Sequence, residues 1–274
     1  MKVAAVQMTS GREVKRNLAE AGRLIEQAAG EGANLVVLPE NFSFLGATDA
    51  ERLAAAEEPG SGPAQDFLAE AARANGVWLV GGTVPIRNET GGRNERACSR
   101  SILFAPDGCR AASYDKIHLF DVAIPGRESE SYRESATTTP GREVVAVETP
   151  LGRIGMAVCY DLRFPALFHR LGVLGMDILV LPAAFTVPTG QAHWRLLLTA
   201  RAVESLVYVV AAGQWGEHAG GRKTYGHSLI VGPWGEVLAE REDDPGVVSA
   251  EIDMIELERI RSKFPVLQHR RELT

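Results

Sequence analysis

The stretch NLVVLPE at residues 34–40 is the part of the sequence that most constrains the fold. Residues 34–38 are almost wholly apolar, and such a run is typical of a strand buried on both faces of a sheet. Pro39 ends the run because proline cannot donate a ladder hydrogen bond, so we expect Glu40 at the C-terminal end of a buried strand. A similar stretch, DILVLPA, occurs at residues 177–183. The pair hints at an internal repeat, although so short a match is weak evidence for one.

Strand and helix patterns alternate on both sides of this stretch. The expected strands are at 2–8, 77–80, 97–104, 110–114, 144–148, 153–159, 177–181, 206–212, 227–231, 237–240 and 247–252. The expected helices are at 14–28, from Gly62 and Pro63 onward, at about 165–171, at about 192–205, and from a cap at Asp253 to Lys263. This order predicts a mixed α/β sheet with helices outside it. No segment is typical of a linker, so we expect residues 1–274 to form a single domain.

Residues 115–141 show no sustained period and few large apolar residues outside IHLF. We expect a long loop here, and long ordered loops often carry function.

The composition excludes several classes of partner. The 274 residues include 45% hydrophobic and 23% charged residues, which is ordinary for a globular protein, with a net charge of −6. An acidic chain offers no clustered positive charge for nucleic acid or an anionic membrane, so a small-molecule substrate is the better hypothesis. The first apolar run is too short for a signal peptide, and no run approaches the length needed to span a bilayer. We therefore expect a cytoplasmic protein.

Cys159 is a candidate nucleophile because it lies between a predicted strand and a turn into a helix. Such a turn exposes a side chain at the sheet edge, and the Tyr160 N–H could help to form an oxyanion hole. Burial as a small hydrophobe is the commoner role of a cysteine at such a place. Cys98 and Cys109 lack this context, and three cysteines without a CxxC pair predict free thiols.

The base that a thiol nucleophile needs is not an obvious histidine. None of the six histidines carries a local signature of a cysteine protease or of a metal site, and Ser228 lacks the GxSxG elbow. Glu40, where solvent is partly excluded, suits a proton carrier, but a carboxylate that caps a loop amide would look the same. Lys116 lies in YDKIHLFD, whose apolar residues suggest a loop anchored inward, although a lone lysine is usually solvated.

Three segments together resemble a known family. VVLPEN at 36–41, YDKIHLFD at 114–121 and GMAVCYDLRFP at 155–165 look like the three catalytic segments of the nitrilase superfamily of carbon–nitrogen hydrolases, in the same order. The resemblance extends from KVAAVQM near the start to FPVLQHRR near the end.

The resemblance implies a role for each matching residue. Glu40 would be the general base, Lys116 the oxyanion stabiliser, Cys159 the nucleophile and Glu134 a second glutamate that orients Lys116 and the substrate. It implies a four-layer α-β-β-α sandwich that forms a homodimer or a larger homo-oligomer through helices, and it implies no metal and no organic cofactor.

The substrate is less constrained by the resemblance. The segments at 182–194, 198–205 and 225–239 look most like the branch that contains deaminated glutathione amidase, with a neighbouring omega-amidase branch. Both branches act on an amide with an oxo-acid head, and we expect Tyr160, Phe185 and His193 to contact the oxyanion or substrate. Ala166 and Arg195 depart from the usual pattern. Arg195 would favour a doubly anionic substrate if it pointed inward, but we expect it to be solvated.

Other functions remain open from the sequence alone. A nitrilase or N-carbamoyl amidase would use the same framework on another carbon, although a nitrilase would be expected to have a CWE-like sequence around the cysteine. A catalytically silent scaffold is disfavoured because the four residues Glu40, Lys116, Glu134 and Cys159 are all present.

Overall fold

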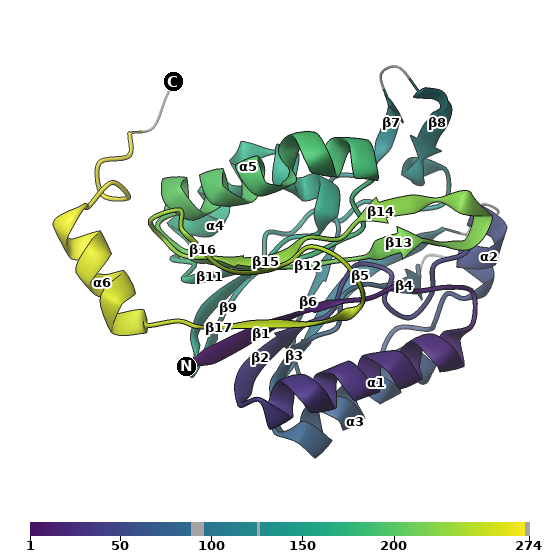
Figure 1. Ribbon diagram of the computed structural model, residues 1–274, viewed down its shortest axis with the longest axis horizontal. Coiled ribbons are helices and arrows are strands. Elements are labelled where there is room, and N and C mark those ends of the chain that lie inside the picture. Colours follow the sequence, from purple (N-terminus) through teal and green to yellow (C-terminus); the bar gives the residue numbers. More distant parts are fainter. Residues whose placement is uncertain (89–95, 125–126, 272–274) are drawn as a thin grey trace.

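Two mixed β-sheets lie face to face at the centre of the molecule, with helices on their outer faces (Figure 1). The structure is a computed structural model that describes residues 1–88, 96–124 and 127–271, without the side chains of 127–130. Helices α1 (Val14–Gly30) and α3 (Pro63–Asn75) cover one sheet, and α4 (Pro165–Val173) and α5 (Val187–Ser205) cover the other. The fold is therefore the four-layer α-β-β-α sandwich that the resemblance to the nitrilase superfamily implies.

The strands of the described residues form two large sheets and two small pairs. The first sheet has the spatial order β17 (Gly246–Glu251), β1 (Lys2–Gln7), β2 (Ala33–Val37), β3 (Trp78–Val80), β5 (Ala97–Phe104) and β4 (Val84–Arg87), with β6 (Arg110–Asp115) also paired to β5. The second has the order β16 (Val237–Arg241), β15 (Ser228–Val231), β12 (Tyr208–Gly213), β11 (Ile178–Ala183), β10 (Gly152–Met156) and β9 (Ala146–Thr149). The small pairs are β7 (Asp121–Ile124) with β8 (Arg127–Arg133), and β13 (Trp215–Glu217) with β14 (Lys223–Tyr225).

Strand β2 shows why its sequence is apolar on both faces. Leu35 and Val37 join the hydrophobic cluster between the two sheets, whereas Val36 and Leu38 join the cluster beneath α1 and α3. Side chains alternate between the faces of a strand, so a strand covered on both sides has no solvent-facing position from Leu35 to Leu38, and only Asn34 at its start is exposed. All four side chains are fully buried, and each contributes about 1.5–3 kcal/mol of transfer free energy.

The two sheets are built in the same way. In the first, β1, β2 and β3 are parallel and are followed by antiparallel β5; in the second, β10, β11 and β12 are parallel and are followed by antiparallel β15. The similar stretches NLVVLPE and DILVLPA lie in the equivalent strands β2 and β11. The weak repeat in the sequence therefore has a counterpart in the topology of the fold.

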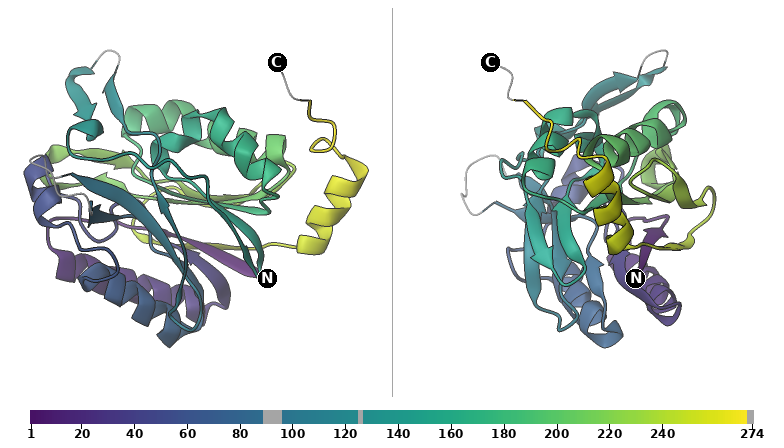
Figure 2. Two further views of the ribbon diagram at one scale, coloured as in Figure 1. Left: turned by 180° about the vertical axis from the view of Figure 1, so that it is seen from behind. Right: turned by 90° about the vertical axis from the view of Figure 1, so that its left-hand side faces the viewer.

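The segment expected to be a long loop is not one. It contains the antiparallel hairpin of β7 and β8 and a short 3-10 helix, η1 (Glu134–Ala136). The sequence concealed the hairpin because its strands are short and polar, as in RESESYR of β8. The hairpin projects at the end of the sandwich where α2 (Asp49–Ala54) lies, as both Figure 1 and Figure 2 show.

Several other elements differ from the prediction at their ends. Strand β10 stops at Met156, so Cys159 begins a separate 3-10 helix, η2 (Cys159–Arg163). Helix α5 begins five residues earlier than expected because Pro188 is tolerated in a first helical turn. Helix α2 and the β13–β14 pair were not predicted. The cap at Asp253 is confirmed: its side chain accepts hydrogen bonds at the start of α6 (Met254–Lys263).

The helices of the described residues are too short or too polar to cross a lipid bilayer. The α6 helix lies at the end of the sandwich opposite the β7–β8 hairpin (Figures 1 and 2).

Candidate active site

Glu40 follows the C-terminal end of β2, a central strand of the first sheet, where the chain turns sharply. The next residue, Asn41, has a left-handed φ of 59°, and its N–H donates to Thr83 Oγ1 over 2.8 Å. The Glu40 carbonyl accepts a hydrogen bond of 3.0 Å from Gln214 Nε2. With its backbone held on both sides, Glu40 projects a carboxylate into the interior, where only 3% of the residue is exposed.

Lys116 lies just beyond β6 and is 2% exposed. Its Nζ is 2.8 Å from Glu40 Oε1 and 2.8 Å from Glu134 Oε2. Burial by itself lowers the pKa of Lys116, but the carboxylates of Glu134 and Glu40 more than reverse this effect and raise the pKa above its ordinary value. The ammonium therefore stays charged, and two of its three N–H donors point at carboxylates.

Glu134 reaches Lys116 because the β7–β8 hairpin brings the chain back to the segment that precedes β7, close to Lys116. The residue begins η1 directly after β8, and its Oε2 also accepts a 2.7 Å hydrogen bond from the Phe120 N–H just before β7. Both ends of the hairpin are thus tied to one carboxylate oxygen. The segment expected to be a functional loop, 115–141, does supply seven of the residues that line the pocket, but it is built around an ordered hairpin.

Cys159 is the first residue of η2 and has a left-handed φ of 48°. A non-glycine residue in this region is strained, and such strain clusters at functional sites. Burial raises the pKa of the Cys159 thiol well above its ordinary value, and the neighbouring Glu40 carboxylate raises it further. Lys116 and the backbone of Ala184 act in the opposite direction without cancelling the rise. The resting side chain is therefore a neutral thiol that needs a base.

Asp161 is a buried carboxylate that is not among the site residues predicted from the sequence. It is fully buried and accepts hydrogen bonds from the Tyr114 hydroxyl at 2.7 Å, the Val158 N–H at 2.9 Å and the His118 N–H at 3.0 Å. The His118 ring nitrogen Nδ1 lies 2.7 Å away as well. Asp161 therefore joins the segment around Lys116 to the turn that carries Cys159. An acidic residue inside the apolar run CYDLRF was the available signal.

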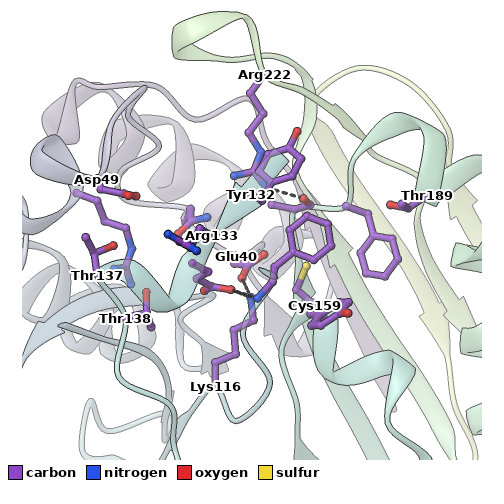
Figure 3. A pocket seen from close by; sticks show the side chains of 17 residues that line it. Glu40, Asp49, Lys116, Tyr132, Arg133, Thr137, Thr138, Cys159, Thr189 and Arg222 are labelled. Atoms are coloured by element: carbon purple, nitrogen blue, oxygen red, sulfur yellow. Dashed lines mark hydrogen bonds and ion pairs between the residues drawn. The ribbon is translucent and has the colours of Figure 1, made fainter. Parts of the chain in front are cut away.

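These side chains share one pocket of about 150 Å³, with Glu40, Lys116 and Cys159 close together at its base (Figure 3). Its lining residues are Glu40, Asn41, Asp49, Arg52, Lys116, Phe120, Tyr132, Arg133, Glu134, Thr137, Thr138, Cys159, Tyr160, Ala184, Phe185, Thr189 and Arg222. Six of the seven predicted site residues are in this set. The three arginines among the lining residues, Arg52, Arg133 and Arg222, could not be singled out from the sequence, because arginines on polar segments look solvated.

The predicted binding residues are not equally placed. Tyr160 and Phe185 line the pocket. The centroids of the Phe185 and Trp194 rings are 4.7 Å apart. Tyr160 is the second residue of η2, and the first amides of a helix have no partner within it, so its N–H can serve an incoming oxygen. His193 does not line the pocket: it is exposed on α5, with Nδ1 3.2 Å from Arg163.

The two departures from the usual pattern lie outside the pocket. Ala166 is exposed on α4, and the Arg195 side chain is 58% exposed and pairs with Glu240. The expectation that Arg195 is not directed inward is confirmed. All three cysteines are free thiols, as predicted.

Comparison with known proteins shows the family of this chain. The sequence profile of the carbon–nitrogen hydrolase family matches residues 2–262. The chain belongs to this family. Among curated carbon–nitrogen hydrolases it is 41% identical over 269 residues to deaminated glutathione amidase of Yersinia enterocolitica, covering 98% of this chain and 92% of that one. It is 37% identical over 270 residues to omega-amidase NIT2 of Danio rerio, covering 98% and 94%.

Solved carbon–nitrogen hydrolase structures share the fold. The NitFhit protein of C. elegans superposes with a TM-score of 0.89 at 36% identity, covering 98% of this chain. The chain spans 65% of that longer protein. The fold expected from the three motifs is thus confirmed by relatives as well as by the layers of the structure.

Proposed function

We propose that this carbon–nitrogen hydrolase is an amidase that cleaves deaminated glutathione into 2-oxoglutarate and cysteinylglycine. The observation that carries the proposal is the Glu40–Lys116–Glu134 ion-pair cluster around the Cys159 thiol, inside a pocket that opens into a larger hollow. Relatives named for this activity are 41% identical over nearly the whole chain. A non-enzymatic scaffold would have no need for a buried lysine with two carboxylates beside a strained cysteine.

The first step is proton transfer followed by attack. Glu40 takes the Cys159 proton, and the thiolate adds to the amide carbon of the substrate to form a tetrahedral intermediate. A base is required because the raised pKa of Cys159 keeps its thiol protonated. Glu40 lines the same pocket as Cys159, which supports a direct proton transfer between the two side chains.

The second requirement is a site for the negative oxygen. The Lys116 ammonium has three N–H donors, of which two point at Glu40 and Glu134. The third donor and the Tyr160 N–H are available to the oxyanion. One such donor typically contributes about 3 kcal/mol of barrier reduction. Glu134 keeps the ammonium in place and touches Phe120, so its role is to orient Lys116.

The intermediate then collapses in two stages. Glu40 returns its proton to the departing nitrogen, the carbon–nitrogen bond breaks, and an acyl thioester remains on Cys159. Glu40 next takes a proton from water, which attacks the thioester, and the Cys159 sulfur leaves as a thiol after receiving that proton. Atoms balance as amide plus water giving acid plus amine, with no other reactant.

Omega-amidase activity on 2-oxoglutaramate is the second candidate, because the relative named for it is 37% identical. Both substrates share the oxo-acid head, and only the amine half differs. Ammonia needs almost no room, whereas cysteinylglycine needs a hollow beyond the catalytic residues. A hollow of about 650 Å³ shares six lining residues with the pocket, which favours the larger leaving group.

The test is a comparison of kcat/KM for deaminated glutathione and 2-oxoglutaramate with the purified protein. We expect preference for deaminated glutathione; comparable or reversed values would move the protein to the omega-amidase branch. The Cys159→Ala variant is expected to lose turnover and keep a melting transition close to wild type. Activity in that variant would refute the assignment of the nucleophile.

Assembly and location are also proposals. We propose a homodimer or a larger homo-oligomer, as the family resemblance predicts, and a cytoplasmic location. Exposed large apolar side chains on α5 and near α6 support self-association: Leu196, Val203, Trp234, Ile255 and Phe264. Light scattering of the purified protein tests the assembly, and a monomer at all concentrations would contradict it.

A further inference from the structure

The catalytic pocket continues into a second space, which we call the outer hollow. Its volume is about 650 Å³, and it is lined by Phe44, Leu45, Gly46, Ala47, Thr48, Ser131, Ala219, Gly220 and Gly221 together with the shared residues. The residues shared by both spaces are Asn41, Asp49, Arg52, Tyr132, Arg133 and Arg222. Cys159, Phe185 and Thr189 line only the inner pocket. A substrate longer than the inner pocket must therefore extend past the shared residues.

The chemistry decides which half of the substrate lies there. In the proposed reaction Glu40 delivers a proton to the departing nitrogen, so that nitrogen must face Glu40 once Cys159 has bonded to the carbon. The outer hollow begins at Asn41, the residue next to Glu40. In Figure 3 Arg133 and Arg222 lie on the opposite side of Cys159 from Thr189. The acyl half therefore lies toward Phe185 and Thr189, and the amine half extends into the outer hollow.

The wall between the two spaces is cationic. Among the six shared residues, Arg52, Arg133 and Arg222 face one carboxylate, Asp49, and Arg52 is also within electrostatic range of Glu134 and Glu40 in the inner pocket. Asp49 lies one turn before Arg52 on α2. Within the described ranges, neither Arg52 nor Arg222 forms an ion pair with a carboxylate. An excess of positive charge facing a cavity in an acidic protein calls for an anionic ligand.

Two of these arginines also have hydrogen-bonding capacity that the protein does not use. Nη1 of Arg52 and Nε of Arg222 are buried without a hydrogen-bond partner among the described atoms. Arg222 is otherwise held in place, because its Nη2 donates to the Ala184 carbonyl at 3.0 Å and its guanidinium lies 5.4 Å from the Tyr132 ring centroid. Buried donors without partners are costly, and a ligand oxygen would satisfy them.

We propose that Arg52 and Arg222 form a subsite at the mouth of the outer hollow that binds a carboxylate on the amine half of the substrate. The inference rests on the proposed amidase function, and it specifies the substrate class as amides whose leaving amine is itself an acid. Arg195 on α5 was considered as a possible partner for a doubly anionic substrate. In this proposal the cations that bind such a substrate are instead Arg52 on α2 and Arg222 between β13 and β14.

The experiment uses two substrates that differ only in charge: deaminated glutathione and its C-terminal carboxamide. Wild-type protein is expected to prefer the carboxylate in kcat/KM by on the order of tenfold or more, as for a charge-assisted hydrogen bond. Arg52→Gln and Arg222→Gln should each bring this ratio toward one, mainly by raising KM for the carboxylate. Arg195→Gln, a matched change at an exposed arginine outside the pocket, should leave the ratio unchanged.

Two further measurements keep the outcome unambiguous. Arg52→Lys retains the charge and should keep most of the preference, which separates lost charge from disturbed packing. If wild-type protein hydrolyses neither compound, the amidase proposal fails, and the subsite is judged by calorimetric binding of both compounds to Cys159→Ala protein. The subsite would be refuted if Arg52→Gln and Arg222→Gln had the same kcat/KM ratio for carboxylate over carboxamide as the wild-type protein. Equal binding of the two compounds to Cys159→Ala protein would refute it as well.

Discussion

Lys116 and Glu40 form a 2.8 Å ion pair in which both side chains are almost completely buried. Removing one partner of a buried pair leaves an uncompensated charge, which typically costs about 3–5 kcal/mol. We therefore predict that Lys116→Met lowers the free energy of unfolding by that order and lowers kcat by about a hundredfold or more.

A double variant separates these two effects. Lys116→Met with Glu134→Gln removes the ammonium together with one of its carboxylates, so it should recover part of the stability and none of the activity. Denaturant unfolding and turnover assays on both variants provide the measurement. Recovery of activity in the double variant would argue against Lys116 as the oxyanion donor.

For the Cys159 thiol we predict that loss of Glu40 makes alkylation at a given pH faster and makes turnover slower. Because burial and Glu40 raise its pKa, the rate of alkylation by iodoacetamide should keep rising with pH above neutrality in the wild-type protein. Glu40→Gln removes the carboxylate that opposes the thiolate, so its alkylation profile should shift to lower pH while turnover is lost. A wild-type plateau at neutral pH would instead indicate a resting thiolate and remove the need for Glu40 as the base.

Asp161 is expected to affect both stability and turnover, because it holds the backbone on both sides of the catalytic residues. Asp161→Asn disturbs acceptors for Tyr114, Val158 and His118, so we predict a loss of about 1–3 kcal/mol in unfolding free energy and a lower kcat with KM little changed. The matched control is Asp115→Asn, which breaks a partly exposed ion pair with Arg100 and should cost about 1 kcal/mol or less. Equal effects of the two changes would show that Asp161 has no special positioning role.

His218 makes stability depend on pH. Burial lowers its pKa to about 4, while its Nδ1 lies 2.8 Å from the Ser10 carbonyl. The unfolded chain binds a proton near pH 6.5 and the folded chain does not, so the unfolding free energy should be highest above about pH 6.5 and fall toward pH 4 by about 3 kcal/mol. His218→Gln should flatten this slope, whereas His269→Gln, at an exposed position, should leave it intact. Unfolding curves across this pH range measure both.

The parts of the fold that the sequence predicts well are those where one pattern decides the structure. The apolar run at β2 could be placed because no solvent-facing residue interrupts it, and Asp253 could be placed because a side-chain cap is local. The β7–β8 hairpin could not be placed, since its stability depends on contacts such as Glu134 with Phe120 that are distant from any strand pattern.

The candidate site divides in the same way. The three motif residues and Glu134 were named because their types and order match a family. Arg52, Arg222 and Asp161 were not, because an arginine or aspartate acquires meaning only from what surrounds it in space. His193 shows the converse, since its segment matches the family but its side chain lies outside the pocket.

The equivalence of the two sheets has a consequence for how the enzyme could fail. The proposed base, ammonium and orienting glutamate all come from the first half of the chain, whereas the sulfur and the Phe185 side of the pocket come from the second. Neither half holds a complete reaction centre. A small displacement of one sheet relative to the other would separate these two groups of residues while both halves stayed folded. Turnover is therefore expected to respond to the packing of the two sheets more sensitively than folding does.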